Sequence, residues 1–337
     1  MHKFHVVSQF LRHPILLYAR LRNKILSRKK RTFFSPSPYS ISETRENRLD
    51  EFAAKHYREV SFLDNASWKK TVASNTVFVA GSDIIWQPAL GYPAKNFLDF
   101  AVLAGLPCFS YASSIGSPDL PKKYHRAYRR YLGAFRDISV REEAAAKMLE
   151  PIICKPVTKV VDPTLLLDSS DWNTFSDQAQ LSVEAAPSGF VFCYFVMDDQ
   201  RYWDYVASVH EQTGLQVIVL PMHYRDEEQP YSIVLDGTPY EFVWLIKNAE
   251  FVLTDSFHAC AFSLQYEKEF YLIRRTRKAE DDKYNDFLGR YNLISRVVDS
   301  EKPFERRRET DYSCAIKQLA KDRADSYAFL QKAVSNM

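Results

Sequence analysis

The sequence contains little glycine, no paired cysteines and no long apolar run, and each absence excludes a class of protein. Nine glycines and sixteen prolines among 337 residues are too few for a collagen-like or low-complexity chain. The five cysteines are scattered and never spaced as Cys-x-x-Cys, which argues against a zinc ribbon or a disulfide scaffold and suits a reducing cytoplasm. No apolar stretch approaches the roughly 18 residues of a membrane span, and polar residues interrupt every signal-peptide core before Ser40.

Several signature motifs are also missing. The chain has no Gly-x-Gly-x-x-Gly, no Walker loop, no Gly-x-Ser-x-Gly and no His-Glu-x-x-His, so no motif indicates dinucleotide, P-loop, serine-hydrolase or zinc chemistry. His125, His210 and His223 have no companions at metal-ligand spacing. We therefore expect neither a metal nor a resident cofactor.

Acidic residues are missing from residues 1–42, which hold nine Lys and Arg. The rest of the chain has 36 Lys and Arg against 42 acidic residues, a net charge of −6. Apolar spacing on both sides of Pro14 predicts two short helices in this basic arm, the second from about Pro14 to Ser27. Residues 1–31 either contact an anionic membrane surface peripherally or pack on their own domain. No nucleic-acid motif accompanies them, and we expect no nucleic-acid partner.

From residue 43 onward, apolar runs of strand length alternate with amphipathic segments, which predicts βαβ units and parallel sheets. Helices are expected over 43–56, 119–135, 141–149, 201–213, 257–266 and 312–332, with another beginning at a Thr238–Glu241 capping box. Strands are expected over 76–80, 107–112, 137–140, 157–161, 190–195, 216–221, 232–236, 251–254 and 269–273.

The length predicts roughly two domains of about 150 residues each, and the polar stretch 168–189 has no clear period. The expected organisation is a basic N-terminal helical arm (1–42), an N-terminal Rossmann-like domain (43–168), a linker (169–189), a C-terminal Rossmann-like domain (190–300) and a C-terminal helix (301–337). A ligand is expected in a cleft between the two domains, at the carboxyl ends of the strands.

The segment Thr254–His258 joins a predicted strand to a predicted helix start. Free N–H groups and the positive helix end favour a bound anion there, and His258 is suited to donate a proton. The pattern is equally compatible with a capped helix and a structural histidine.

Gly81-Ser82-Asp83 follows another predicted strand, and Asp83 is a candidate for accepting a sugar hydroxyl or acting as a base. The small residues Ser113, Ser114 and Gly116 form a similar turn, which either cradles an anion or simply turns the chain.

Arg141 begins a predicted helix. Because a cation at a helix N-terminus opposes the helix dipole, we expect Arg141 to have a partner, either an internal carboxylate such as Glu142 or a bound anion.

Five segments in the same order resemble the polysaccharide pyruvyl transferase family, over about residues 45–300. They are Val79–Trp86, Ser110–Gly116, Ser139–Glu143, Asp162–Leu166 and Thr254–His258. The resemblance implies an α/β fold with two Rossmann-like domains in a GT-B-like arrangement. The first domain lacks the opening strand, loop and helix of many family members, so either the chain is one unit shorter or the basic arm replaces that unit.

The resemblance also implies an activity, the transfer of pyruvate from phosphoenolpyruvate to two hydroxyls of a sugar in a surface polysaccharide or exopolysaccharide, as a ketal. His258 would be the general acid, Arg141 would hold phosphate or carboxylate together with N–H groups near Ser256 and Phe257, and Asp83 would face the acceptor. The acceptor is a glycan, with a lipid-linked form as one alternative. Further substrate contacts are expected from Gly81, Ser82, Ser113, Ser114, Gly116 and Arg275.

The sequence departs from the family pattern at several positions. Ser256 and Phe257 stand where other members carry Arg and Leu, so the phosphate-binding cation is expected from Arg274 or Arg275. Ile84 stands where Gln is common, and Lys283 replaces an arginine, which keeps the charge but loses the two-pronged geometry.

Two other functions stay open from sequence alone. One is a GT-B-type glycosyltransferase that uses a nucleotide sugar, and the other is an inactive, truncated relative that acts as an interaction protein. We expect a cytoplasmic protein, with peripheral contact at the inner face of the plasma membrane as an alternative.

Overall fold

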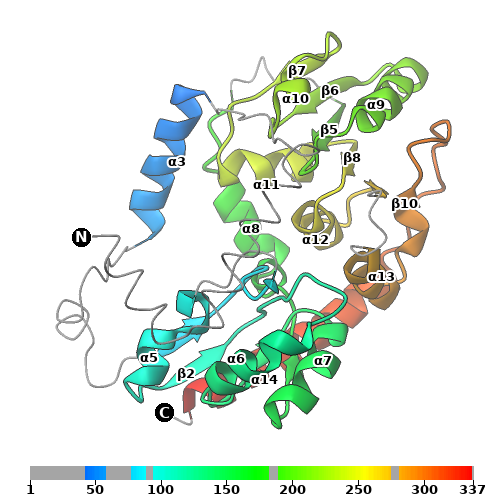
Figure 1. Cartoon of the computed structure of the whole chain (residues 1–337). Coiled ribbons are helices and arrows are strands. Elements are labelled where there is room, and N and C mark those ends of the chain that lie inside the picture. The colour runs from blue at the N-terminus through cyan, green and yellow to red at the C-terminus, as the bar shows by residue number, and fades with distance from the viewer. Residues whose placement is uncertain (1–41, 58–76, 89–93, 182–188, 275–280, 336–337) are drawn as a thin grey trace. The chain divides into compact units, whose positions relative to one another are not determined.

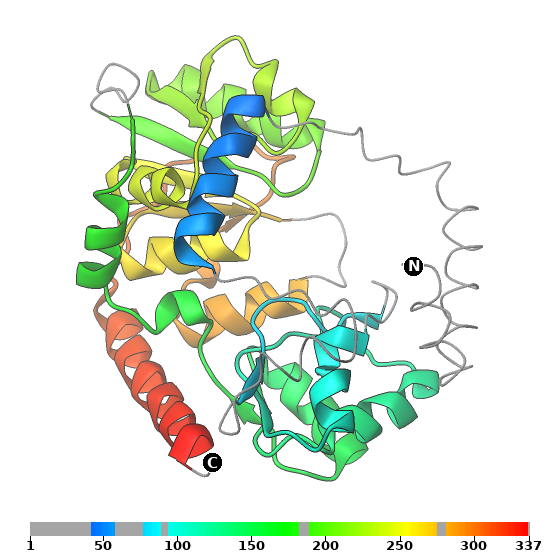
Figure 2. The same ribbon diagram turned by 90° about the vertical axis from the view of Figure 1, so that its left-hand side faces the viewer.

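The computed structural model describes residues 42–57, 77–88, 94–181, 189–274 and 281–335. Their contacts divide them into two compact units (Figures 1 and 2). Unit 1 holds the described residues of 73–162 and those from Ala328 onward, and unit 2 holds those of Ser37–Val72 and Pro163–Tyr327. The predicted arm helices and the segment that would replace the family's opening element lie outside the described residues.

Unit 2 is built on a six-stranded parallel sheet with the strand order β10-β9-β8-β5-β6-β7. Counted from β5, this is the Rossmann order 3-2-1-4-5-6. The order reverses between the neighbouring strands β5 and β8, so the switch point of the sheet lies at their carboxyl ends. The strands are β5 (Phe190–Tyr194), β6 (Gln216–Val219), β7 (Ser232–Val234), β8 (Phe251–Thr254), β9 (Phe270–Ile273) and β10 (Val297–Val298).

A helix follows each strand of this sheet except the last and returns the chain to the next parallel strand (Figure 1). The continuous apolar runs of β5 and β8 are buried, as expected for strands covered on both faces. The predicted capping box is confirmed, because Thr238 caps α11 and the Glu241 side chain accepts a bond from the Thr238 backbone N–H. The helices are α9 (Gln200–Thr213), α10 (Tyr224–Glu227), α11 (Pro239–Asn248), α12 (Phe257–Gln265) and α13 (Asp281–Arg290), with α14 (Ser313–Ser335) after the sheet.

The helix predicted over 43–56 is confirmed as α3 (Glu43–His56), but it groups with unit 2 and not with the N-terminal domain to which we assigned it. The reason is tertiary. Arg45 is buried and donates to the carbonyls of Pro221 and Gly237. Arg48 pairs with Glu241 at 2.6 Å. Figure 2 shows α3 beside the helices of unit 2.

The stretch expected to be a linker, 169–189, begins with a helix, α8 (Ser169–Ser176). The Asp168 carboxylate caps it by accepting the N–H groups of Ser170 and Asp171. The Trp172 ring packs 4.8 Å from the Phe262 ring of α12. An eight-residue helix is too short to show a helical period in the sequence, so only the Asp168 cap could have indicated it.

Unit 1 contains two pairs of parallel strands, β1 (Phe78–Ala80) with β2 (Cys108–Ser110) and β3 (Ser139–Val140) with β4 (Thr158–Lys159). Side chains join the pairs. The Ser110 hydroxyl donates to the Ser139 carbonyl at 2.9 Å, and the Ser139 hydroxyl donates to the Ser110 carbonyl at 2.8 Å. Both serines are fully buried. The α/β class with parallel sheets, expected from the sequence, is therefore confirmed in both units.

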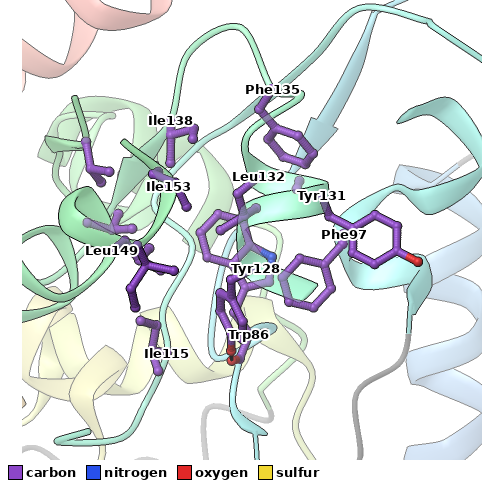
Figure 3. Close-up of a cluster of buried hydrophobic side chains, with 14 of the residues drawn as sticks. Trp86, Phe97, Ile115, Tyr128, Tyr131, Leu132, Phe135, Ile138, Leu149 and Ile153 are labelled. Atoms are coloured by element: carbon purple, nitrogen blue, oxygen red, sulfur yellow. Dashed lines mark hydrogen bonds between the residues drawn. The ribbon is translucent and has the colours of Figure 1, made fainter. Parts of the chain in front are cut away.

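Helices α5 (Asp99–Leu103), α6 (Lys122–Leu132) and α7 (Glu143–Ile153) accompany these strands. A buried aromatic cluster fills the core of unit 1 (Figure 3). In it, the Trp86 ring stacks 5.9 Å from Phe97, and the Tyr128 hydroxyl donates to the Trp86 carbonyl. Trp86 also donates its backbone N–H to the Ser114 carbonyl at 3.1 Å. The core thus anchors the segment after β1 that carries Asp83.

We expect Ser139→Ala to destabilise the chain by about 1–3 kcal/mol. The substitution leaves the buried Ser110 carbonyl and the Ala112 N–H without the hydrogen bonds that they make to the Ser139 hydroxyl. Urea denaturation measures the change. The matched control is Ser117→Ala, which removes an exposed hydroxyl bonded to the Asp119 carbonyl and should change stability by less than about 0.5 kcal/mol. Equal effects of the two substitutions would contradict a structural role for the serine pair.

Candidate functional site

The carboxyl ends of β5 and β8 are joined by a network of hydrogen bonds around Asp255. This buried carboxylate accepts the backbone N–H of Val196 at 2.6 Å and that of Met197 at 3.1 Å. The Thr254 hydroxyl donates to the Tyr194 carbonyl at 2.6 Å. The two loops that leave the switch point in different directions are therefore tied to each other. From the sequence, Asp255 was expected only to lie between a strand and a helix, and this cross-loop role was missed.

His258 lies in the first turn of α12, directly after this network. Ser256 is the N-cap of the helix, and its hydroxyl accepts the N–H of Ala259 at 3.4 Å. The His258 side chain is half-buried, so the ring is not enclosed in the core. The first N–H groups of a helix have no acceptor within it and carry the positive end of the dipole. This strand end can therefore bind an anion next to an imidazole.

Phe257 has a packing role through its side chain. Its ring lies 4.9 Å from that of Phe287 in α13, and the His258 ring lies 5.6 Å from it, edge to face. Tyr284 of α13 also donates its hydroxyl to the Asp255 carbonyl at 2.7 Å. Helix α13 thus supports the α12 start from one side. The role predicted for Phe257 in substrate binding stays a prediction.

The predicted residues of unit 1 gather at the carboxyl ends of its strands. Asp83 and Ser113 form an isolated parallel bridge, and Ser113 forms another with Val140, so the edge continues across the unit. Gly81 has φ +145°, and a Cβ there would lie 2.0 Å from the Tyr111 carbonyl oxygen, so only glycine fits. Gly116 is also required, since its φ is +58° and a Cβ would lie 2.3 Å from the Ile84 side chain.

The three serine hydroxyls at this edge bond to the protein itself. Ser82 donates to the Ala112 carbonyl at 3.2 Å, Ser113 to the Ala80 carbonyl at 3.0 Å and Ser114 to Glu142 Oε1 at 2.7 Å. The structure thus supports the turn-stabilising interpretation of these residues, while their role in substrate binding stays a prediction.

Arg141 is buried and has internal carboxylate partners, the first of the two alternatives expected. Its Nη1 donates to Asp162 at 2.9 Å and its Nε to Glu142 at 3.1 Å, and its Nη2 lies 3.7 Å from Asp83. Burial by itself would lower the pKa of Arg141, but the Glu142 and Asp162 carboxylates outweigh it and raise the pKa. Glu142 was expected as a partner because it is adjacent in the sequence, whereas Asp162 is brought close to Arg141 by the parallel pairing of β3 and β4.

Two carboxylates at this edge differ in what surrounds them. The Asp83 side chain is 64% exposed, on a backbone with φ +70°. Glu142 has one oxygen bonded to Ser114 and Arg141, while its buried Oε2 has no hydrogen-bond partner in the described part of the chain. In the described part of the chain, the ion pairs of this cluster join one guanidinium, that of Arg141, to the three carboxylates of Asp83, Glu142 and Asp162. Such an edge suits the hydroxyls of a sugar better than an anion.

Arg275, proposed to bind phosphate, lies outside the described residues, and so does the side chain of Lys283. Arg274 is exposed at the end of β9. Within the described ranges, no group of three or more His, Cys, Asp or Glu side chains is arranged to hold a metal. No helix in those ranges combines the length and apolar character needed to cross a bilayer.

We expect Asp255→Asn to loosen the loop after β5 that carries Val196 and Met197. The reason is that an amide has one acceptor oxygen where the carboxylate has two. Hydrogen exchange of the Val196 and Met197 amides should accelerate, and stability should fall by about 1–3 kcal/mol. The control is Asp198→Asn, which removes only a half-exposed ion pair with Arg225 and should cost under about 1 kcal/mol. If hydrogen exchange at both amides were unchanged in Asp255→Asn, Asp255 would not hold the loop after β5 in place.

Comparison with known proteins gives one family. The model of the polysaccharide pyruvyl transferases matches residues 12–277. This match begins inside the basic arm, so the likeness to the family starts well before residue 45, where we had placed it. A comparison with curated protein sequences finds no match.

Among solved structures, the chain is similar to the glycotransferase of kitacinnamycin, with 13% identity over 86% of this chain and 78% of that one and a TM-score of 0.44. It is also similar to the UDP-N-acetylglucosamine 2-epimerase of Rickettsia bellii, with 10% identity over 88% and 89% and a TM-score of 0.45. The UDP-GlcNAc 2-epimerase of Methanocaldococcus jannaschii has 11% identity over 84% and 76% and a TM-score of 0.40. Because the family model covers most of the sequence, including all five resembling segments, the chain belongs to the polysaccharide pyruvyl transferase family, a family of transferases.

Proposed function

We propose that the chain transfers pyruvate from phosphoenolpyruvate to two hydroxyls of a sugar in a surface polysaccharide, as a ketal. The observation that carries the proposal is the position of His258, half-buried in the first turn of α12 at the switch point of a Rossmann-ordered sheet. An imidazole and a positive helix end suit a small anionic donor that must be protonated. Membership of the family supports the same reaction.

In this reaction, His258 acts as the general acid and gives a proton to C3 of the enol phosphate, and C2 becomes oxocarbenium-like. One sugar hydroxyl attacks C2 and loses its proton to a base. Phosphate then leaves with the electrons of its C2–O bond, and the second hydroxyl attacks C2 and loses its proton. The products are the cyclic ketal and inorganic phosphate. Positive charge near the leaving phosphate stabilises the transition state, and the α12 N-terminus supplies it.

Unit 1 supplies the contacts to the acceptor in this proposal. Its edge has the exposed carboxylate of Asp83. This carboxylate can accept a hydrogen bond from a sugar hydroxyl, and Asp83 is the candidate base. Arg141 holds the cluster together through Glu142 and Asp162. A guanidinium has five N–H donors, so the binding of phosphate or carboxylate by Arg141 stays a prediction.

A nucleotide-sugar reaction is less well supported because side chains of α3 bond to the chain just after β6 and β7, where a nucleoside would be expected. In a Rossmann unit, the acidic residue that binds ribose lies at the second strand, which is β6 here. The carbonyl of Pro221, just after β6, accepts a bond from Arg45, and the Gly237 carbonyl after β7 accepts another. The nearby carboxylate of Glu241 is used by Thr238, Gln180 and Arg48. Burial would raise the pKa of Glu241, but these bonds outweigh it and lower the pKa.

We expect the wild-type chain to release phosphate from phosphoenolpyruvate in the presence of the right glycan and to add a ketal to that glycan. His258→Ala should lower kcat by about 10²–10⁴-fold, the usual contribution of a general acid. His125→Ala is the control. His125 lies in α6, away from α12, and bonds to the Leu120 carbonyl, so its substitution should leave the rate unchanged. Phosphate release that survives in His258→Ala would remove His258 from the mechanism.

Ligand-dependent melting separates the two reactions. Phosphoenolpyruvate at a hundredfold excess over its Kd should stabilise the chain by about 2.7 kcal/mol, and nucleotide sugars should leave the Tm unchanged. Stabilisation by a nucleotide sugar and none by phosphoenolpyruvate would favour the glycosyltransferase. No shift with either ligand, together with an unaltered cellular phenotype in His258→Ala, would favour the interaction protein.

A further inference from the structure

Helix α6 has five cations on one face and no acidic residue. Lys122, Lys123, Arg126, Arg129 and Arg130 are all exposed. At 100° per residue, they fall within an arc of about 120°. The opposite side of the helix is buried through Tyr124, Tyr128, Tyr131 and Leu132. Since the buried side fixes the rotation of the helix, the five cations form one defined surface, which we call the α6 basic face.

The cations of the α6 basic face have no carboxylate partner within ion-pair distance in the part of the chain that the structure describes. Lys123 lies 4.7 Å above the Tyr124 ring and Arg130 5.8 Å from the Tyr131 ring. Arg129 Nε donates to the Ile152 carbonyl at 2.7 Å. These contacts engage the charged ends of the side chains with ring faces and a carbonyl oxygen, and none of them brings a negatively charged group to the α6 basic face.

This charge pattern is unfavourable for the helix itself. Lys122 and Arg126, and Arg126 and Arg130, are like charges four residues apart, which repel each other. Lys122 and Lys123 also stand at the positive end of the helix dipole. The neighbouring helix α7 shows the usual arrangement, with Lys147 paired to Glu143 at 3.6 Å. A merely solvated helix face would mix the two signs in the same way.

We propose that the α6 basic face docks on an anionic lipid surface. Eleven residues of helix present a straight row about 16 Å long, and each Lys or Arg near an anionic leaflet contributes to binding. The aromatic residues of α6 are buried, so no ring is presented for stacking on nucleic-acid bases. The chain beyond residue 42 has a net charge of −6, so most of its surface should repel an anionic membrane. Contact by this part of the chain therefore requires a local basic face. The inference does not depend on the transfer chemistry.

The test is sedimentation of the full chain with vesicles of phosphatidylcholine, with and without phosphatidylglycerol. Wild type should bind only the anionic vesicles, and added salt should release it. In the variant Lys122→Gln, Lys123→Gln, Arg126→Gln and Arg130→Gln, each lost cation should weaken binding by about fivefold. Arg129 is kept because it bonds to the Ile152 carbonyl.

Two further variants keep the test specific. Lys147, Lys302, Lys317 and Lys321 are exposed elsewhere, and changing all four to Gln lowers the net charge equally but should leave binding unchanged. Lys29, Lys30 and Arg31 belong to the basic arm, and their change to Gln should leave the α6-dependent part intact. The proposal is wrong if the wild type does not bind anionic vesicles. It is also wrong if the control variant or the arm variant by itself abolishes that binding. It is also wrong if α6 instead governs binding to RNA or to an acidic polysaccharide. Unchanged circular dichroism and Tm show that each variant is folded.

Discussion

The candidate site of unit 2 depends on the hydrogen bonds that the buried Asp255 carboxylate accepts from the loop after β5. Strands β5 and β8 lie side by side, but the chain leaves them toward opposite halves of the sheet. Backbone N–H groups at this divergence need acceptors, and Asp255 accepts those of Val196 and Met197. The same segment continues through the Ser256 cap into α12. The position of His258 is therefore a consequence of how the sheet is held at its switch point.

The two units offer different chemistry at their strand ends. Unit 2 has a helix N-terminus and an imidazole, which suit an anion and a proton transfer. Unit 1 has Arg141 surrounded by Asp83, Glu142 and Asp162, which suits hydroxyl groups. Helix α3 is attached to unit 2 through Arg45, which donates to the carbonyls of Gly237 and Pro221.

Sequence reasoning succeeded where the signal was local. The capping box at Thr238 and the apolar run Phe251–Thr254 predicted the start of α11 and all of β8. It failed where the determining contact was distant. Nothing near α3 in the sequence shows that Arg45 bonds to carbonyls at positions 221 and 237. Likewise, the spacing around Arg141 suggested Glu142, but Asp162 became its partner only through the pairing of β3 with β4.

The fate of one proton tests the account most directly. If a protein acid protonates C3 of phosphoenolpyruvate, transfer carried out in heavy water must place one deuterium in the methyl group of the ketal. Mass spectrometry or NMR of the glycan product measures this label. The account predicts a product with a CH₂D group, formed together with one phosphate. A glycan that gains a sugar from a nucleotide donor, or a pyruvyl group whose methyl carries no deuterium, would contradict it.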